Sequence, residues 1–120
     1  MAYGFNDDKS KAEVYTAENF KTGLKFYADG NYTANPGQTT TIYMKLSSSA
    51  ESISKDDVVA ILGVTGMYLN PNLQIRHIEI YNNATDFRIL VQLYNNSSNS
   101  VYTFSASGSQ YIELSALVKS

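Results

Sequence analysis

Apolar and polar residues alternate along most of this chain, with a period of two residues. The alternation is most regular in residues 87–95, where the apolar positions are Phe87, Ile89, Val91 and Leu93. Successive side chains of a β-strand point to opposite faces of a sheet, so the pattern predicts a strand with one buried face. A chain that repeats this pattern between turns must build its core from paired strands.

Further strands are expected wherever the alternation recurs. They cover residues 24–28, 39–46, 73–82, 101–105 and 110–118. Residues that favour turns separate them, as at residues 29–31 (Asp-Gly-Asn) and 35–37 (Asn-Pro-Gly). Short strands with short polar connectors predict a mainly β chain, an antiparallel β-sandwich of the Ig-like or jelly-roll type.

The apolar parity of each strand also predicts the core. We expect these side chains to be mostly buried: Phe26, Ile42, Met44, Leu46, Ile78, Ile80, Phe87, Ile89, Val91, Leu93, Ile112 and Leu114. Within residues 73–82 the apolar parity changes between Ile75 and Ile78. A slip of one residue moves later side chains to the other face, so we expect either a β-bulge near Arg76 and His77 or a strand buried on both faces.

One segment departs from the period of two. Val58, Ile61 and Leu62 have the i, i+3, i+4 spacing of one helix face. Ser54 is a suitable N-cap, and Gly63 is a suitable stop. We therefore predict one short helix near residues 55–62. Two turns of helix are unstable alone, so packing would have to hold it.

Residues 1–22 are polar and lack a regular pattern. We expect them to form an N-terminal arm, and residues 23–120 to form the β-sandwich domain. Aromatic anchors such as Tyr3, Phe5 and Phe20 would let the arm add a strand to a neighbouring subunit or insert side chains into it. The alternative is that the arm forms the first strand of its own sandwich.

The composition limits the classes of partner. The chain has 120 residues, no Cys, a single His and a net charge of −2. This excludes a disulfide framework, a thiolate metal site and a basic footprint for nucleic acid. No apolar run approaches the ~20 residues that span a bilayer, and the start lacks the pattern of a signal peptide. We expect a chain made in the cytoplasm, with no nucleic-acid or membrane partner.

Few residues could support catalysis. His77 has no second His or Cys with which to build a metal site, and no Ser lies in a G-x-S-x-G motif. The acidic pair Asp56 and Asp57 would stabilise the start of the predicted helix, and Asp7 and Asp8 are not followed by the spacing of a calcium loop. We expect no catalytic site, no metal site and no cofactor, and therefore no enzyme.

Tyrosine is the most informative residue type. The chain has 10 Tyr, and only 17% of its residues are charged. Several tyrosines fall on the strand parity opposite the core, and exposed apolar patches usually mark interaction sites. The alternative is that Tyr is simply a good strand former, covered here by the arm and the helix. The candidate interface residues are Tyr3, Phe5, Tyr15, Phe20, Tyr27, Tyr43, Leu90, Tyr94, Tyr111 and Leu117.

Three stretches carry a family resemblance. Residues 1–15 read MAYGFNDDKSKAEVY, residues 35–43 read NPGQTTTIY, and residues 101–109 read VYTFSASGS. The first resembles the starts of small virion proteins of tailed phages. The others look like turn–strand phrases of Ig-like and jelly-roll modules in phage head-decoration, head-fibre and baseplate proteins. The resemblance implies a non-catalytic virion protein that assembles in multiple copies with itself or with other virion proteins.

A second class of function stays open at this point. Outward tyrosines stack well on sugar rings, so the chain could be a carbohydrate-binding or adhesion module with a glycan partner. The absence of Trp counts against this class, because Trp offers the largest stacking surface.

Overall fold

A computed structural model describes residues 15–119 of the chain. The strands are β1 (Phe20–Ala28), β2 (Tyr32–Ala34), β3 (Thr39–Leu46), β4 (Val58–Tyr68), β5 (Leu73–Ile80), β6 (Arg88–Asn95), β7 (Tyr102–Phe104) and β8 (Tyr111–Val118). Two single 3-10 turns, η2 (Ala17–Asn19) and η3 (Lys55–Asp57), precede β1 and β4. The predicted mainly antiparallel β class is confirmed.

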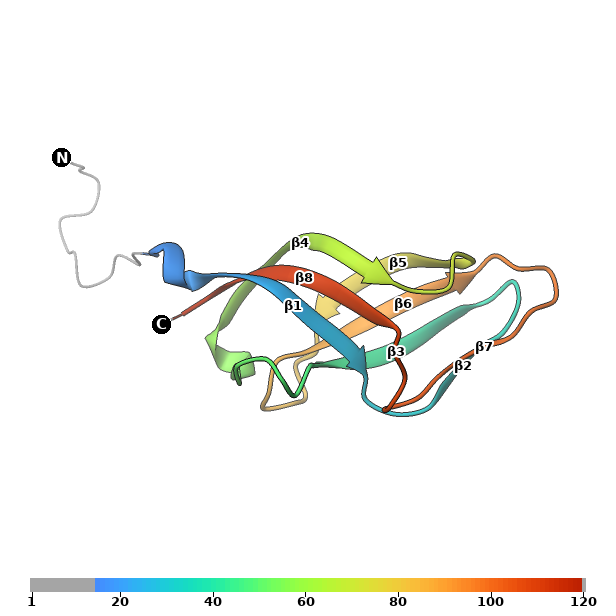
Figure 1. Ribbon diagram of the computed structural model, residues 1–120, viewed down its shortest axis with the longest axis horizontal. Helices are drawn as coiled ribbons and strands as arrows, with labels where there is room; N and C mark the ends of the chain where they lie inside the picture. The colour runs from blue at the N-terminus through green and yellow to red at the C-terminus, as the bar shows by residue number, and fades with distance from the viewer. Residues whose placement is uncertain (1–14, 120) are drawn as a thin grey trace.

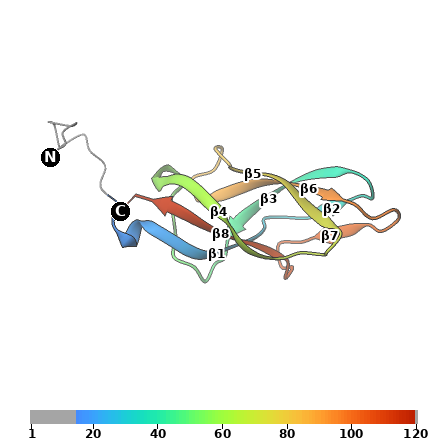
Figure 2. The same cartoon turned by 90° about the horizontal axis from the view of Figure 1, so that it is seen from above.

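Six strands form one antiparallel sheet in the order β4-β8-β1-β3-β6-β5, and β2 and β7 form a separate ribbon. In the middle of the sheet, β1 and β3 share only three residue pairs, from Phe26 with Leu46 to Ala28 with Met44. The sheet curls so far that it is nearly closed, and its inner face encloses the core. The body measures 61 × 26 × 24 Å, with the start of β1 and the end of β8 at one end and the ribbon towards the other (Figures 1 and 2).

The core is the one that the strand parity predicts. Nine of the expected side chains are buried: Phe26, Ile42, Met44, Phe87, Ile89, Val91, Leu93, Ile112 and Leu114. Leu46, Ile78 and Ile80 are half-buried and pack against this cluster. At its centre, the rings of Phe26 and Phe87 meet edge to face with centroids 4.9 Å apart. The two rings join β1 to the residue that precedes β6.

The expected irregularity in β5 is confirmed as a bulge. The pairing of β5 with β6 shifts register between Ile75 and His77. Because of this shift, Ile75 and Ile78 both pack against the core although their sequence parity differs. The turn at residues 35–37 is also present, with the Gln38 N–H donating to the Asn35 carbonyl at 3.3 Å. Gly37 occupies its corner at φ +71°, a conformation that favours glycine.

The helix predicted near residues 55–62 is wrong. After the single turn of η3, the chain enters β4, which pairs with β8 along its whole length. Ser54 makes no side-chain capping bond and instead forms an isolated β-bridge with Asp86. Valine and isoleucine favour strands because their branched side chains pack well on a pleated surface. Pairing with the buried strand β8 therefore outweighed the weak helix signal.

The register of β4 explains why its sequence resembled a helix. Four β4 residues pair with the buried face of β8: Val58 with Val118, Ile61 with Ala116, Val64 with Leu114 and Met67 with Ile112. Three register shifts leave Val59, Leu62 and Thr65 as extra residues between these pairs. Three residues of β4 therefore match two residues of β8. The resulting apolar period of three is close to the 3.6-residue period of a helix.

The sheet begins before the expected domain boundary at residue 23. β1 starts at Phe20, which pairs with Leu117. Just before it, the Asn19 side-chain amide donates to the Val118 carbonyl at 2.7 Å and ties η2 to the end of β8. Residues 20–22 are therefore part of the domain. The first 14 residues of the expected arm lie outside the described residues.

Candidate functional site

The outward tyrosines form a row across one half of the sheet. Tyr27 on β1 contacts Tyr111 on β8, with ring centroids 5.6 Å apart, and Tyr111 contacts Tyr68 on β4 at 6.0 Å. The Lys25 ammonium lies 4.7 Å from the centre of the Tyr111 ring. Tyr27 and Tyr111 are half-buried by these contacts, whereas Tyr68 at the edge is 59% exposed. The row therefore leaves one ring accessible.

A second tyrosine cluster lies on the other half of the sheet. Tyr43 contacts Tyr81 at 4.7 Å and Tyr32 at 6.5 Å between ring centroids. The Tyr32 hydroxyl donates to the Asp29 carboxylate, which also accepts from the Arg88 guanidinium at 3.1 Å. Partial burial, together with the hydrogen bond to Asp29, raises the pKa of Tyr32 to about 12. This cluster ties the start of the ribbon to the main sheet.

Arg88 is the charged centre of this cluster. Its Nε atom donates to both carboxylate oxygens of Asp86, at 2.9 and 3.1 Å. These hydrogen bonds raise the pKa of Arg88 above its usual value. An open pocket of about 480 Å³ lies beside it, lined in part by Tyr43, Tyr81 and Asn83. The carboxylates of Asp29 and Asp86 both accept hydrogen bonds from the Arg88 guanidinium, so the three side chains form a structural ion-pair network.

The other predicted interface residues are scattered. Tyr94 lies on β6 under the Arg76 guanidinium, 4.6 Å from its ring centre, and Leu90 is half-buried on the same strand. Phe20 is 51% exposed beside Leu117. Tyr15 is half-buried, and Tyr3 and Phe5 lie outside the described residues. The described members of the predicted interface therefore form separate groups instead of one continuous patch.

Sequence reasoning missed the main exposed apolar surface, which lies on β4. Among the described residues, seven large apolar side chains are exposed, and five of them belong to this strand: Val59, Leu62, Val64, Met67 and Tyr68. Their exposed fractions run from 39% to 59%. β4 holds no charged residue, and it is an edge strand with a partner on one side only. We call these five side chains the β4 strip.

The opposite edge of the sheet has a different character. Along β5, the exposed side chains are those of Gln74, Arg76, His77 and Glu79, and the strand is interrupted by its bulge. Charged side chains and bulges are the usual means by which proteins prevent unwanted pairing at a sheet edge. The two edges therefore differ in charge: β5 is polar and charged, whereas β4 is apolar and uncharged.

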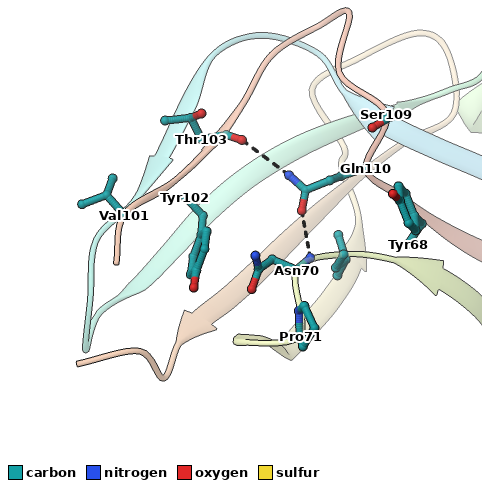
Figure 3. Close-up of a pocket in the computed structure, with 9 residues that line it drawn as sticks. Tyr68, Asn70, Pro71, Val101, Tyr102, Thr103, Ser109 and Gln110 are labelled. Carbon is teal, nitrogen blue, oxygen red and sulfur yellow. Dashed lines mark hydrogen bonds between the residues drawn. The ribbon is translucent and has the colours of Figure 1, made fainter. Parts of the chain in front are cut away.

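An open pocket of about 500 Å³ adjoins the end of β4 (Figure 3). The rings of Tyr68 and Tyr102 and the side chains of Asn70 and Gln110 line it, together with Leu69, Pro71, Val101, Thr103 and Ser109. The Gln110 amide spans its floor, accepting from the Asn70 N–H at 3.0 Å and donating to the Thr103 carbonyl at 3.4 Å. Aromatic rings next to oriented amides are groups that can hold a sugar or another polar ring.

The environment of Tyr102 is fixed by a neighbouring loop. The Asn72 side-chain amide donates to the Tyr102 hydroxyl at 2.6 Å, and this bond lowers the pKa of Tyr102. The ring is therefore held in place at the mouth of the pocket. Neither Tyr68 nor Tyr102 was among the interface residues predicted from the sequence: Tyr68 follows the segment expected to be a helix, and Tyr102 lies in a short predicted strand to which no interface residue was assigned.

His77 is an exposed side chain on the edge strand β5. It is exposed at the β5 bulge, with Nε2 3.2 Å from the Glu79 carboxylate. Within residues 15–119, no group of three His, Asp or Glu side chains is placed to hold a metal ion. In the same range, no helix is long and apolar enough to cross a membrane.

Comparison with known proteins adds no assignment: no family model, curated protein or solved structure matches the chain. The function must therefore be argued from the surface itself.

Proposed function

We propose that this chain is a non-catalytic structural protein of a phage virion, which docks on neighbouring subunits through one edge of its sheet. The observation that carries the docking role is the β4 strip. Exposed apolar edges are a liability to a free protein, and patches of this kind usually mark contact surfaces. A subunit that is covered by a neighbour has no need of the charges that protect β5.

The virion assignment depends on the resemblance of residues 1–15, 35–43 and 101–109 to small tailed-phage proteins. It makes the chain a head-decoration, head-fibre, tail or baseplate component, synthesised in the host cytoplasm and found in the particle. Its partners are other virion proteins or further copies of itself. The proposed architecture is a β-sandwich, in which β4-β8-β1 and β3-β6-β5 form two layers. The narrow contact between β1 and β3 supports this division.

Particle labelling tests this function. Phage particles from a culture that produces the chain are purified by density gradient and probed with a specific antibody, using electron microscopy and quantitative mass spectrometry. We expect several copies in each particle and antibody label at a repeated position on the head or tail. Chain that stays in the cell lysate, with unlabelled particles, would contradict the virion role.

The pocket in Figure 3 favours one alternative, a carbohydrate-binding or adhesion module. Tyr68 and Tyr102 offer ring faces for stacking, and Asn70 and Gln110 offer hydrogen bonds to hydroxyls. A glycan array with the purified chain tests this role. Specific binding that disappears in Tyr102→Ala but persists in Tyr94→Ala, a tyrosine variant outside the pocket, would favour the alternative. The absence of binding to any glycan would remove it.

A further inference from the structure

We infer that the pocket in Figure 3 binds a short uncharged glycan, with one sugar ring against Tyr68 and another against Tyr102. This inference goes beyond the docking role of the β4 strip. It rests on the carbohydrate-binding alternative and names the ligand class and the binding mode, which that alternative leaves open. Four features of the pocket carry it: its lack of charge, its two rings, its fixed amides and the hydrogen-bond donors between the rings.

The lining of the pocket is uncharged. Its volume of about 500 Å³ lies in the usual range of ligand pockets, and none of the nine residues that line it is acidic or basic. A charged ligand would lose hydration here without gaining an ion pair. The pocket of about 480 Å³ beside Arg88 differs in this respect, because Asp29, Asp86 and Arg88 line it. The pocket in Figure 3 therefore favours an uncharged ligand.

Two tyrosine rings line the pocket from different sides. Figure 3 shows Tyr68 on one side of the Gln110 amide and Tyr102 on the other. The C–H face of a sugar ring is apolar and packs on an aromatic ring. Beyond Tyr68, the next ring is that of Tyr111, which already contacts Tyr68 and the Lys25 ammonium. The accessible stacking surface ends at Tyr68, so the site suits a short glycan with one sugar ring for each tyrosine.

The polar groups of the pocket are fixed before a ligand arrives. The Gln110 side chain bonds to the Asn70 N–H at 3.0 Å and to the Thr103 carbonyl at 3.4 Å. The Asn72 side-chain amide holds the Tyr102 hydroxyl, and the Asn72 backbone N–H donates to the Asn70 Oδ1 atom at 3.0 Å. Side chains that are already held lose little conformational freedom on binding. The lining is therefore preorganised.

Hydrogen-bond donors remain available between the rings. A carboxamide NH2 group has two donor hydrogens, and the Gln110 Nε2 atom uses only one of them within the described residues. Within residues 15–119, neither the Asn70 Nδ2 atom nor the Tyr68 hydroxyl has a hydrogen-bond partner. A purely apolar ligand would leave these donors unpaired as it displaced water. A neutral sugar combines hydroxyls for the amides with an apolar face for the rings.

Affinity electrophoresis tests the ligand class. The wild-type chain is run in native gels that contain galactan, mannan or dextran, which are uncharged. It is also run in gels that contain polygalacturonate or alginate, which are the carboxylate-bearing counterparts of the first two. We expect retardation by at least one neutral polysaccharide and by neither charged one. No retardation in any gel, or retardation by the charged polysaccharides alone, would overturn the inference.

Ring substitutions test the binding mode. Binding of the disaccharide from the retarding polysaccharide is followed by tyrosine fluorescence, which is suitable because the chain has no Trp. Tyr68→Ala should weaken binding about fivefold to tenfold, since one stacking ring is lost from a side chain that is 59% exposed. Tyr68→Phe keeps the ring and should bind within about twofold of the wild type. Tyr94→Ala, outside the pocket, is the control and should bind as the wild type does.

A conservative amide substitution tests the hydrogen bonds. Asn70→Asp keeps the Oδ1 acceptor for the Asn72 N–H but replaces the NH2 donors with a charged oxygen. We expect it to weaken binding about tenfold or more. Asn96→Asp makes the same change at an exposed amide outside the pocket and should have no effect. Circular dichroism melts should match the wild type for both. Binding that is unaffected by both Tyr68→Ala and Asn70→Asp would place the site elsewhere and overturn the inference.

The outcomes separate this inference from the proposed functions. Labelled phage particles, together with a chain that binds no neutral glycan, would refute the inference and leave the virion role standing. Binding to charged glycans alone would keep the carbohydrate-binding alternative and refute the ligand class. Pocket-dependent binding by a chain that is absent from particles would support the inference and refute the virion role.

Discussion

Asn95 is a fully buried amide that joins the β2-β7 ribbon to the main sheet. Its Nδ2 atom donates to the Ala34 carbonyl at 3.0 Å and to the Ser100 carbonyl at 2.8 Å. Its Oδ1 atom accepts from the Ser97 N–H at 2.9 Å. One side chain thus hydrogen-bonds three backbone groups: a carbonyl on β2, and a carbonyl and an N–H in the segment that leads into β7. We expect its loss to be the most costly polar substitution in the described chain.

Asn95→Ala removes all three hydrogen bonds and leaves their backbone partners without this amide. Each bond contributes about 1 kcal/mol net, and a buried group left unpaired costs about 1–3 kcal/mol. We therefore expect the free energy of unfolding to fall by about 3–5 kcal/mol. A domain of this size is stable by about 5–15 kcal/mol, so the variant should fold but unfold at a much lower urea concentration.

Urea unfolding followed by tyrosine fluorescence and circular dichroism measures this change. The neighbouring residue supplies the control, because Asn96 is exposed and its backbone N–H bonds to the Asn72 carbonyl whatever its side chain. Asn96→Ala should change the free energy of unfolding by less than about 0.5 kcal/mol. Equal midpoints for the two variants would show that Asn95 does not hold the ribbon, and the reasoning would fail.

Three further predictions follow from the core, from Tyr32 and from His77. Ile89→Ala and Val91→Ala, both at fully buried positions, should each lower the free energy of unfolding by about 1–4 kcal/mol in thermal or urea melts; wild-type melting of both would contradict the strand parity. Burial and the hydrogen bond to Asp29 raise the pKa of Tyr32 from its ordinary 10.0 to about 12, so Tyr32 favours folding while it is protonated. Its contribution is therefore complete below pH 10 and is lost as the pH rises through 12, so Tyr32→Phe should flatten the pH dependence of stability in this range. His77→Gln should leave the biological activity of the chain intact, and loss of that activity without loss of fold would contradict a non-catalytic role.

The sequence by itself determined most of the sheet. The alternation of Phe87, Ile89, Val91 and Leu93 is a local property of the chain, and burial of one sheet face converts it directly into a strand. The β5 bulge was predictable for the same reason, since a change of parity requires an extra residue wherever one face stays buried. Local alternation could not show the strand order, because the pairing of β1 with both β3 and β8 depends on contacts between distant segments.

The character of the two sheet edges was decided by the tertiary structure alone. Val58, Ile61 and Leu62 are spaced as a helix would space them, and nothing local shows that Val59, Leu62 and Thr65 are extra residues opposite β8. Pairing with a buried strand supplies hydrogen bonds and apolar contacts that eight isolated residues cannot obtain as a helix. That same pairing leaves β4 as an edge and exposes its apolar side chains. Tyrosine content predicted an interaction surface on other strands, whereas the three-dimensional register leaves most of the exposed large apolar side chains of the described residues on β4.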